Sequence, residues 1–230
     1  MTRGYHHGDL ARALVDVGLE IIDEQGLSAF SVAEACRRLK VSQGAPYRHF
    51  ADRNTFLSAI AVRALAVLAD HVTVSSTSAP DPLERLSRSV TGYVIFAARH
   101  PALFEVVFSK EVLIGTNPRL REAIRPVVEA FVLPTYELPG ISYDDAGSVV
   151  VAAAAIAHGY GAFIGIGNFD AADDAIGLAA RKAGQAVKAL ILGPKNFHML
   201  HAEPSITLAG LPFDSWIEEL GITPSRSRVS

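Results

Sequence analysis

Val41-Ser42-Gln43-Gly44-Ala45-Pro46-Tyr47-Arg48-His49-Phe50 is the stretch that decides the fold. Ser42 can cap a short helix through its hydroxyl. Gln43, Gly44 and Ala45 are then the first residues of that helix, whose end can approach a base edge closely. A proline is tolerated only near the start of a helix, because it lacks an N–H and clashes with the preceding turn. Pro46 therefore limits this helix to a short one.

Polar and basic side chains follow the proline as Tyr47, Arg48 and His49. No catalytic template needs this order of side chains, whereas a surface that faces phosphates does. From Cys36 to Arg53 there are five cations and one anion, a local charge of +4 in a chain of net charge −3. A basic patch on an acidic chain is typical of a nucleic-acid-binding surface. A solvated charged face is the alternative.

Helix signals flank this stretch on both sides. Upstream, Ser31 and Glu34 fit a capping box, and apolar residues then recur at helical spacing as a buried stripe, at Val32, Ala35, Cys36 and Leu39. Downstream, Asp52 can cap a third helix whose inner face carries Phe56, Leu57, Ile60 and Ala61. The spacing predicts a helix-turn-helix followed by a supporting helix.

A longer set of motifs points to one family. It comprises Arg3 to Leu10, Gly26-Leu27, Phe30-Ser31-Val32, Val41-Ser42, and the run Tyr47-Arg48-His49-Phe50 with Arg53 three residues later. With these motifs, residues 1 to about 63 closely resemble the DNA-binding domain of TetR-family transcriptional regulators.

The resemblance implies roles for single residues. Tyr47, His49 and Arg53 are expected to contact the DNA backbone, and the start of the short helix, at Gln43, Gly44 and Ala45, to contact bases. Arg48 lies within the same basic run. Two positions depart from the family pattern. Lys40 replaces the usual turn glycine and must adopt a left-handed or near-bridge backbone, and Asn54 replaces the acidic residue common after the cation.

The first residues form an arm, from Thr2 to Gly8, that contains Arg3. Such an arm can reach into a neighbouring minor groove, and we include Arg3 among the expected DNA contacts. Disorder at a chain terminus is the alternative. Asp9 is expected to cap the following helix, which Gly26 ends.

Length and composition limit the class of protein. With 230 residues, half of them apolar and a fifth charged, the chain fits one large or two modest soluble domains. Its single cysteine, Cys36, cannot form an internal disulfide, and the N-terminus has no signal-peptide core. We therefore expect a cytoplasmic protein.

The rest of the chain predicts an all-α fold. The helix capped by Asp52 is expected to continue to about Val74, so it joins the helix-turn-helix domain (residues 1–63) to a C-terminal helix bundle (residues 64–192). Helices are also predicted over 83–99, from Pro101, and from Pro118, with Pro126 as a kink. Residues 193–230 are expected to form an extension, in which one short helix is predicted over Phe213 to Leu220.

Ala146 to Gly167 is a stretch of 22 residues without a charge. A membrane span has that length, but the stretch is mostly Ala and Gly, contains His158, and is flanked by aspartates rather than Lys or Arg. A helix buried on both sides fits better. With a second apolar helix over 171–192 it predicts a two-fold, four-helix dimer interface. Ala157-His158-Gly159 also looks like the His-Gly signature of one C-terminal subgroup of the family.

A regulator of this architecture needs a second site, for a small-molecule effector. The aromatic candidates for its wall are Tyr93, Phe96, Phe104, Phe108, Phe131 and Phe163, and the polar candidates are His100, Tyr136 and His158. Plain core packing is the alternative for each aromatic side chain. His158 lies in the uncharged helix, where an unpaired imidazole is costly, so it needs a protein partner or a ligand. We expect a mostly apolar effector beside it.

The sequence contains no motif of a phosphate loop, a serine hydrolase or a zinc protease. His6-His7 and the pair His198 and His201 near Glu203 lack a strong third ligand, so we expect no metal, no cofactor and no enzymatic activity. The leading hypothesis is a ligand-responsive transcriptional regulator, most simply a repressor that binds a palindromic operator as a homodimer. The alternatives are a helical small-molecule-binding protein without DNA binding and a helical enzyme.

Overall fold

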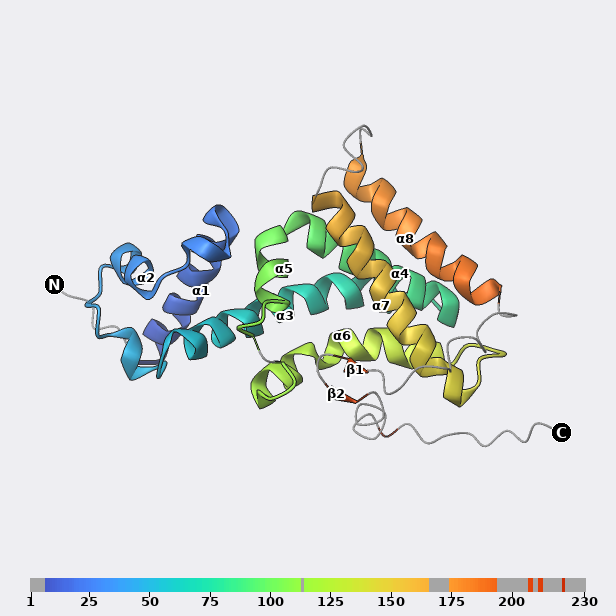
Figure 1. The fold of residues 1–230 in the computed structure, drawn as a ribbon, viewed down its shortest axis with the longest axis horizontal. Helices are drawn as coiled ribbons and strands as arrows, with labels where there is room; N and C mark the ends of the chain where they lie inside the picture. The colour runs from blue at the N-terminus through green and yellow to red at the C-terminus, as the bar shows by residue number, and fades with distance from the viewer. Residues whose placement is uncertain are drawn as a thin grey trace. The chain divides into compact units, whose positions relative to one another are not determined.

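The computed structural model describes residues 7–112, 114–165, 174–193, 207–208, 211–212 and 221. Over these residues the protein is built from helices (Figure 1). The first four are α1 (His7–Gln25), the 3-10 turn η1 (Leu27–Ala29), α2 (Val32–Leu39) and the 3-10 turn η2 (Pro46–Arg48). There follow α3 (Arg53–Ser76), α4 (Pro82–Arg99), α5 (Pro101–Val107), α6 (Pro118–Tyr136), α7 (Tyr143–Gly165) and α8 (Ala175–Leu192). The all-α prediction is confirmed.

The chain forms two compact units. The first contains residues up to 67 together with 100–113, and the second contains residues 68–99 and those from 114 on. The long helix α3 runs through the boundary at 67, as the sequence predicts for the connection. The assignment of α5 differs from the sequence-based division, which placed residues 100–113 in the C-terminal domain. Leu103, Val106 and Val107 explain the difference, because these buried side chains belong to a helix that packs on α1 and η1.

The first unit has an apolar core made by α1, α2, α3 and α5. Gly26 ends α1 with a φ of 84°, a left-handed conformation that favours glycine, and its N–H donates to the Ile22 carbonyl. The fully buried side chains at the centre are Leu14, Ile21, Ile22, Phe56, Leu57 and Ile60. Cys36 is buried on the inner face of α2, as a small core residue.

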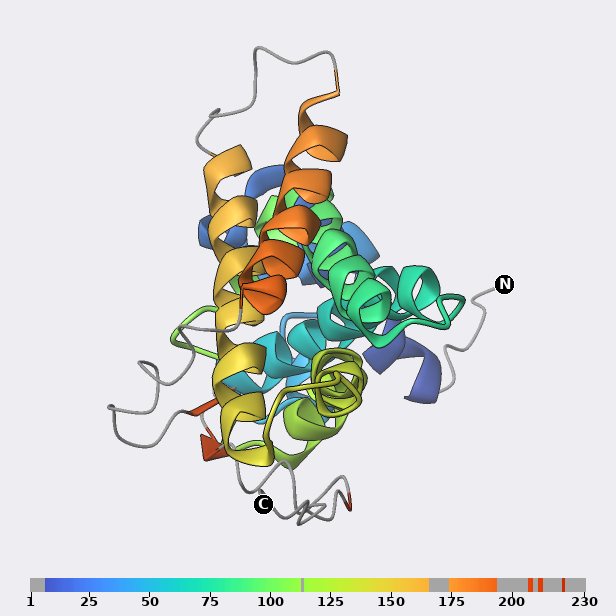
Figure 2. The ribbon, with the colours of Figure 1, turned by 90° about the vertical axis from the view of Figure 1, so that its right-hand side faces the viewer.

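The second unit is organised around α4, which packs against α6, α7 and α8. Figures 1 and 2 both show α7 and α8 side by side over α4. Glycine permits the closest approaches to α4. A Cβ at Gly92 would lie 2.1 Å from the His71 carbonyl oxygen, and one at Gly184 would lie 2.7 Å from Ser87 Oγ. Prolines open α5 and α6, as predicted, and α6 also contains Pro126 and Pro134.

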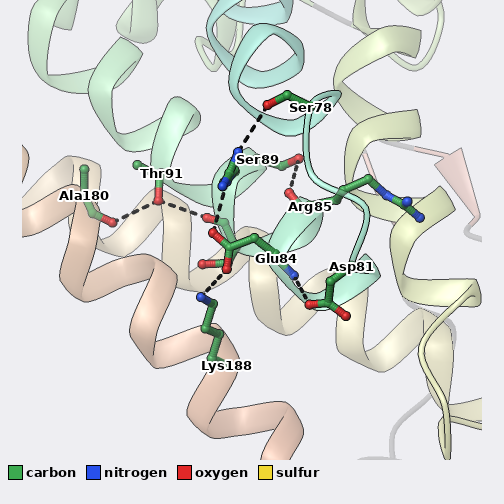
Figure 3. Close-up of polar contacts among 10 residues, drawn as sticks. Ser78, Asp81, Glu84, Arg85, Ser89, Thr91, Ala180 and Lys188 are labelled. Atoms are coloured by element: carbon green, nitrogen blue, oxygen red, sulfur yellow. Dashed lines mark hydrogen bonds and ion pairs between the residues drawn. The ribbon is translucent and has the colours of Figure 1, made fainter.

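Polar contacts connect α4 to α8 across this close approach (Figure 3). The Glu84 carboxylate accepts hydrogen bonds from Lys188 of α8 and, at 3.0 Å, from Arg88 Nε. These two partners, Lys188 before Arg88, hold the pKa of Glu84 below its usual value. One turn further, Thr91 Oγ1 lies 2.9 Å from the Ser87 carbonyl oxygen and 3.3 Å from that of Ala180. The two helices are therefore fixed by direct bonds as well as by packing.

Some features of the structure differ from the sequence-based predictions, and some predicted features fall on residues that the structure does not describe. A two-residue antiparallel hairpin, β1 (Thr207–Leu208) and β2 (Leu211–Pro212), was not predicted. Helix α7 begins at Tyr143, so Asp144 and Asp145 lie in its first turn, directly before the uncharged stretch. By length and composition, residues 53–74 of α3 and all of α7 could cross a membrane. Arg3, His198, His201, Glu203 and the helix predicted over 213–220 lie outside the described residues.

Candidate nucleic-acid interface

The candidate DNA-binding surface, called the reading surface below, comprises the exposed residues from Gln43 to Arg53. It follows the turn that ends α2. The Glu34 N–H donates to Ser31 Oγ at 3.2 Å, so Ser31 caps α2 as predicted. The Glu34 carboxylate does not complete the capping box, because it binds arginines instead. Lys40 has φ 56° and ψ 40°, the left-handed conformation predicted for it. The Val41 N–H then donates to the Cys36 carbonyl at 3.0 Å, which closes the helix end.

The predicted start of the short helix, at Gln43, is wrong. The structure has a turn at Gln43 and Gly44 and a single 3-10 turn over Pro46–Arg48. Pro46 explains the difference, because it has no N–H to donate to the Ser42 carbonyl and a helix from Gln43 would need that bond. The Ala45 N–H uses the Ser42 carbonyl instead, at 3.0 Å. The stretch that should read bases is therefore mostly turn.

Exposure separates the expected contact residues from those that hold them in place. Gln43, Gly44, Tyr47 and Arg48 are exposed, with 55% of Tyr47 accessible. Ala45 and His49 are half-buried, whereas Pro46 and Phe50 are buried. The alternation is what a surface needs if it presents several side chains to a partner while its backbone stays attached to the core.

A stack of three phenylalanines attaches this surface to α3. The Phe50 and Phe56 rings are stacked, with centroids 4.5 Å apart and planes 6° apart. The Phe30 ring meets Phe56 edge-on at 5.3 Å. Next to the stack, the Thr55 N–H donates to Asp52 Oδ1 at 2.7 Å and lowers the pKa of Asp52, so Asp52 caps α3 as predicted.

His49 sits at the end of the 3-10 turn. Its Nε2 is buried and has no hydrogen-bond partner among the described residues. Only Nδ1 is then left for a contact with a molecule outside the chain. The contact with the DNA backbone that the resemblance implies for His49 stays a prediction, and Nδ1 is the atom expected to make it.

Intramolecular ion pairs neutralise much of the basic patch. Arg37 binds the Glu34 carboxylate through Nε and Nη2, both at 2.7 Å, and Arg38 binds Glu34 at 3.0 Å and Glu24 at 2.9 Å. Arg37 and then Arg38 lower the pKa of Glu34 to about 2. The local charge counted from the sequence is therefore an upper bound. Lys40 and Arg48 are exposed and have no ion pair among the described residues.

Arg53 is held by two groups of the first unit. Its Cζ lies 5.5 Å from the centroid of the Phe30 ring, a cation–π distance. Its Nη1 donates to Glu111 Oε2 at 2.8 Å. Glu111 follows α5 and is 58 residues away in the sequence, so no local signal indicates this pair.

The candidate effector residues divide between the two units. His100, Phe104 and Phe108 belong to the first, where His100 Nδ1 lies 3.9 Å from Asp23 Oδ1 and the two phenylalanine rings are 4.9 Å apart. The other six belong to the second unit. The nine candidate residues are therefore distributed over both units.

Tyr93 and His158 are brought together in the second unit. The Tyr93 hydroxyl lies 3.1 Å from His158 Nδ1, and the Tyr93 ring meets Phe131 edge-on. His158 therefore has the protein partner that its place in an uncharged helix required. The histidine is exposed as a whole, yet burial on the side facing Tyr93 lowers its pKa, and burial raises the pKa of Tyr93. Both groups are thus neutral near pH 7.

The remaining three candidates have separate surroundings. Phe96 is fully buried against His71, Tyr136 packs on Tyr143, and Phe163 is 48% exposed beside Tyr160. Phe96 is core packing by this geometry. A hollow of about 310 Å³ lies elsewhere, in the first unit, between Ala11, Arg12, Val15, Asp16, Phe50, Ala59 and Arg63. The described residues contain no group of three or more metal-ligating side chains.

Comparison with known proteins identifies the N-terminal part. Residues 14–60 match the model of the family described as bacterial regulatory proteins, tetR family. A protein of unknown function from Rhodococcus sp. RHA1 has a similar structure, with a TM-score of 0.66 and 24% identity over 80% of this chain and 98% of that one. No curated protein sequence matches the chain.

Two further structures belong to named regulators. A tetR-family regulatory protein from Rhodococcus RHA1 has a TM-score of 0.56 and 21% identity, over 77% of this chain and 95% of that one. A TetR variant from Acinetobacter baumannii, in complex with minocycline, has a TM-score of 0.56 and 19% identity over 86% and 99%. At these identities the likeness shows the shared fold.

The phenylalanine stack and the exposed tyrosine predict opposite mutational effects. Phe50→Ala should lower the free energy of unfolding by about 3–5 kcal/mol, because it removes a buried ring that α3 cannot replace. Tyr47→Ala, a matched change three residues away on the surface, should change it by less than about 0.5 kcal/mol. Chemical denaturation of both variants measures the difference. Equal losses would contradict the division into anchor and surface.

Proposed function

We propose that this chain is a TetR-family transcriptional regulator that represses transcription by binding a near-palindromic operator as a homodimer. A small, mostly apolar effector releases it from DNA. The observation that carries the proposal is the surface of Gln43, Gly44, Tyr47 and Arg48, four exposed residues held by a buried proline and the phenylalanine stack. A repressor of this kind works in the cytoplasm, where the DNA is.

The contact residues divide by the part of DNA they face. Gln43 has an amide that can form paired hydrogen bonds with an adenine edge, and Gly44 and Ala45 let the backbone come close. Tyr47, Arg48, His49 and Arg53 then face phosphates, which position the protein without reading sequence. Arg48 is the strongest single phosphate candidate, because it is exposed and has no ion pair among the described residues.

Mutation should separate the two kinds of contact. Arg48→Ala should weaken binding to all duplexes and reduce the salt slope by about 0.9 per lost phosphate contact. Gln43→Ala should cost about 1–3 kcal/mol mainly on the specific site. Fluorescence anisotropy, with the DNA upstream of the protein's own gene and a mixed-sequence duplex, measures both. Arg99→Ala, which removes an exposed cation of α4, is the matched control. If the salt slope of Arg48→Ala equals that of Arg99→Ala, the phosphate role of Arg48 is contradicted.

The homodimer proposal rests on the surface of α7. This helix has no charge from Ala146 to Gly165, yet only 28% of its most apolar stretch is buried within one chain. Ala155 and Ala162 are exposed seven residues apart, so they mark one stripe along the helix. A second copy, packed by a two-fold axis, would bury this stripe and the adjacent face of α8. Two-fold symmetry also requires half-sites about 34 Å apart or a multiple of that.

A charge on the stripe tests the dimer. Ala155→Arg should convert the dimer to monomers, because burying an unpaired charge in the interface is costly. Leu133→Arg, which places the same charge at an exposed apolar position of α6, should leave the dimer intact. Analytical ultracentrifugation at micromolar concentration gives the masses. A monomeric wild type that binds one isolated half-site tightly would contradict the proposal.

The effector is proposed to bind beside Tyr93 and His158. These two neutral groups, next to the Phe131 ring, offer a hydrogen-bond donor and acceptor within apolar surroundings, which is the usual chemistry of a small-molecule site. Release of DNA requires that the effector favour one arrangement of the protein over the other. We assign His158, Tyr93 and Phe131 to this site and leave Phe96 to the core.

A thermal-shift screen of apolar metabolites and drugs tests the effector site. A true effector should raise the unfolding midpoint, release DNA, and lose most of both effects with Tyr93→Phe, which removes only the hydroxyl. Tyr143→Phe removes a hydroxyl from the same unit and is the matched control. A compound that stabilises the wild type and Tyr93→Phe equally, and leaves DNA binding unchanged, would remove this pair from the site.

A further inference from the structure

Arg53, an expected DNA contact, forms an ion pair within the protein. The guanidinium donates to Glu111 at 2.8 Å, with 41% of the arginine and 46% of the glutamate side chain exposed. Nη1 is one of the three nitrogens through which the guanidinium donates, so a phosphate that approaches this side of Arg53 would compete with the carboxylate for Nη1 and for the positive charge. The carboxylate therefore occupies the place that DNA is expected to take on Arg53.

Glu111 is fixed by the packing of its own segment. The Val112 N–H donates to the Ser109 carbonyl at 3.1 Å, and Ser109 Oγ donates to the Val106 carbonyl at 3.0 Å. Val106 and Val112 are buried. Because the turn around Glu111 is held in this way, little further ordering is needed to keep the carboxylate beside Arg53. The ion pair is thus better preorganised than a pair of two free surface side chains.

At the other end of the segment that carries Glu111, His100 Nδ1 lies 3.9 Å from Asp23 Oδ1, which is an ion pair only when the imidazole is protonated. Along the chain, the segment 100–112 continues into α4 on one side and toward α6 on the other. Both helices belong to the second unit. The segment that carries Glu111 is therefore covalently continuous with elements of the second unit on both sides.

We propose that Glu111 is an internal competitor of DNA for Arg53, and that the segment 100–112 restrains DNA binding through this ion pair. The inference rests on the proposed DNA-binding function. When DNA binds, Arg53 exchanges the carboxylate for a phosphate, so the affinity for DNA is reduced by the strength of the pair. Any event that moves the segment away frees Arg53 and raises that affinity.

Charge removal at two neighbouring glutamates tests the competition. Glu111→Gln keeps the shape and removes the competing charge, so it should tighten binding about two- to fivefold, the range of an exposed ion pair. Glu105→Gln removes an equal charge from exposed Glu105 of α5, which has no ion pair among the described residues, and should have a much smaller effect. In an Arg53→Ala background, Glu111→Gln should give no gain, because the competed group is gone.

Anisotropy titrations of these proteins at low salt, with the upstream DNA and the mixed-sequence duplex, measure the effect. If both glutamine variants tighten DNA binding equally, the effect comes from the change in net charge, and the competitor role of Glu111 is overturned. Weaker binding by Glu111→Gln would mean that the carboxylate positions Arg53 for DNA, which also overturns it. If the wild type and all variants fail to bind either duplex, the proposed function itself is overturned and the inference with it. Circular dichroism establishes that each variant is folded.

Discussion

The stacked rings of Phe50 and Phe56, with Phe30 against them, are the contact on which the reading surface depends. The segment between α2 and α3 has only one 3-10 turn, so its own hydrogen bonds cannot hold it in place. Burial of Phe50 supplies the missing attachment, because it fixes the end of that segment to the first turns of α3. Tyr47 and Arg48 are exposed on one side of this stretch, whereas Pro46 and Phe50 on its other side are buried in the core.

Local signals in the sequence were sufficient for most of the helix boundaries. Gly26, Ser31, Asp52, Pro101 and Pro118 each act within a few residues, through a cap, a left-handed turn or a missing N–H, and each has the predicted role. Lys40 is the clearest case, since the motif required a left-handed residue there and the structure has one. Pro46 limits its helix more strongly than predicted, because the lost hydrogen bond is the one that would have closed the first turn.

Contacts between distant parts of the chain could not be predicted in this way. The basic patch was counted over a window in which every cation is treated as free. The fold instead brings Glu24 and Glu34 to Arg37 and Arg38, and Glu111 to Arg53. For the same reason the amphipathic pattern of α5 indicates that one face is buried, but not that α1 and η1 are the elements that cover it. Pairing of charges, rather than their number, then decides how much electrostatic attraction remains for DNA.

The second unit contains a partly buried polar pair, Tyr93 and His158, whose hydrogen bond joins two neutral groups. Burial lowers the pKa of His158 and raises that of Tyr93, so neither carries a charge near pH 7. Replacing their mutual hydrogen bond by bonds to a ligand therefore transfers no charge out of water, and the free-energy cost is that of one neutral hydrogen bond, about 0.5–1.5 kcal/mol. A charged ligand would instead have to lose its hydration without an opposite charge from this pair. For the proposed effector site, this pair therefore favours an uncharged molecule that can donate or accept a hydrogen bond.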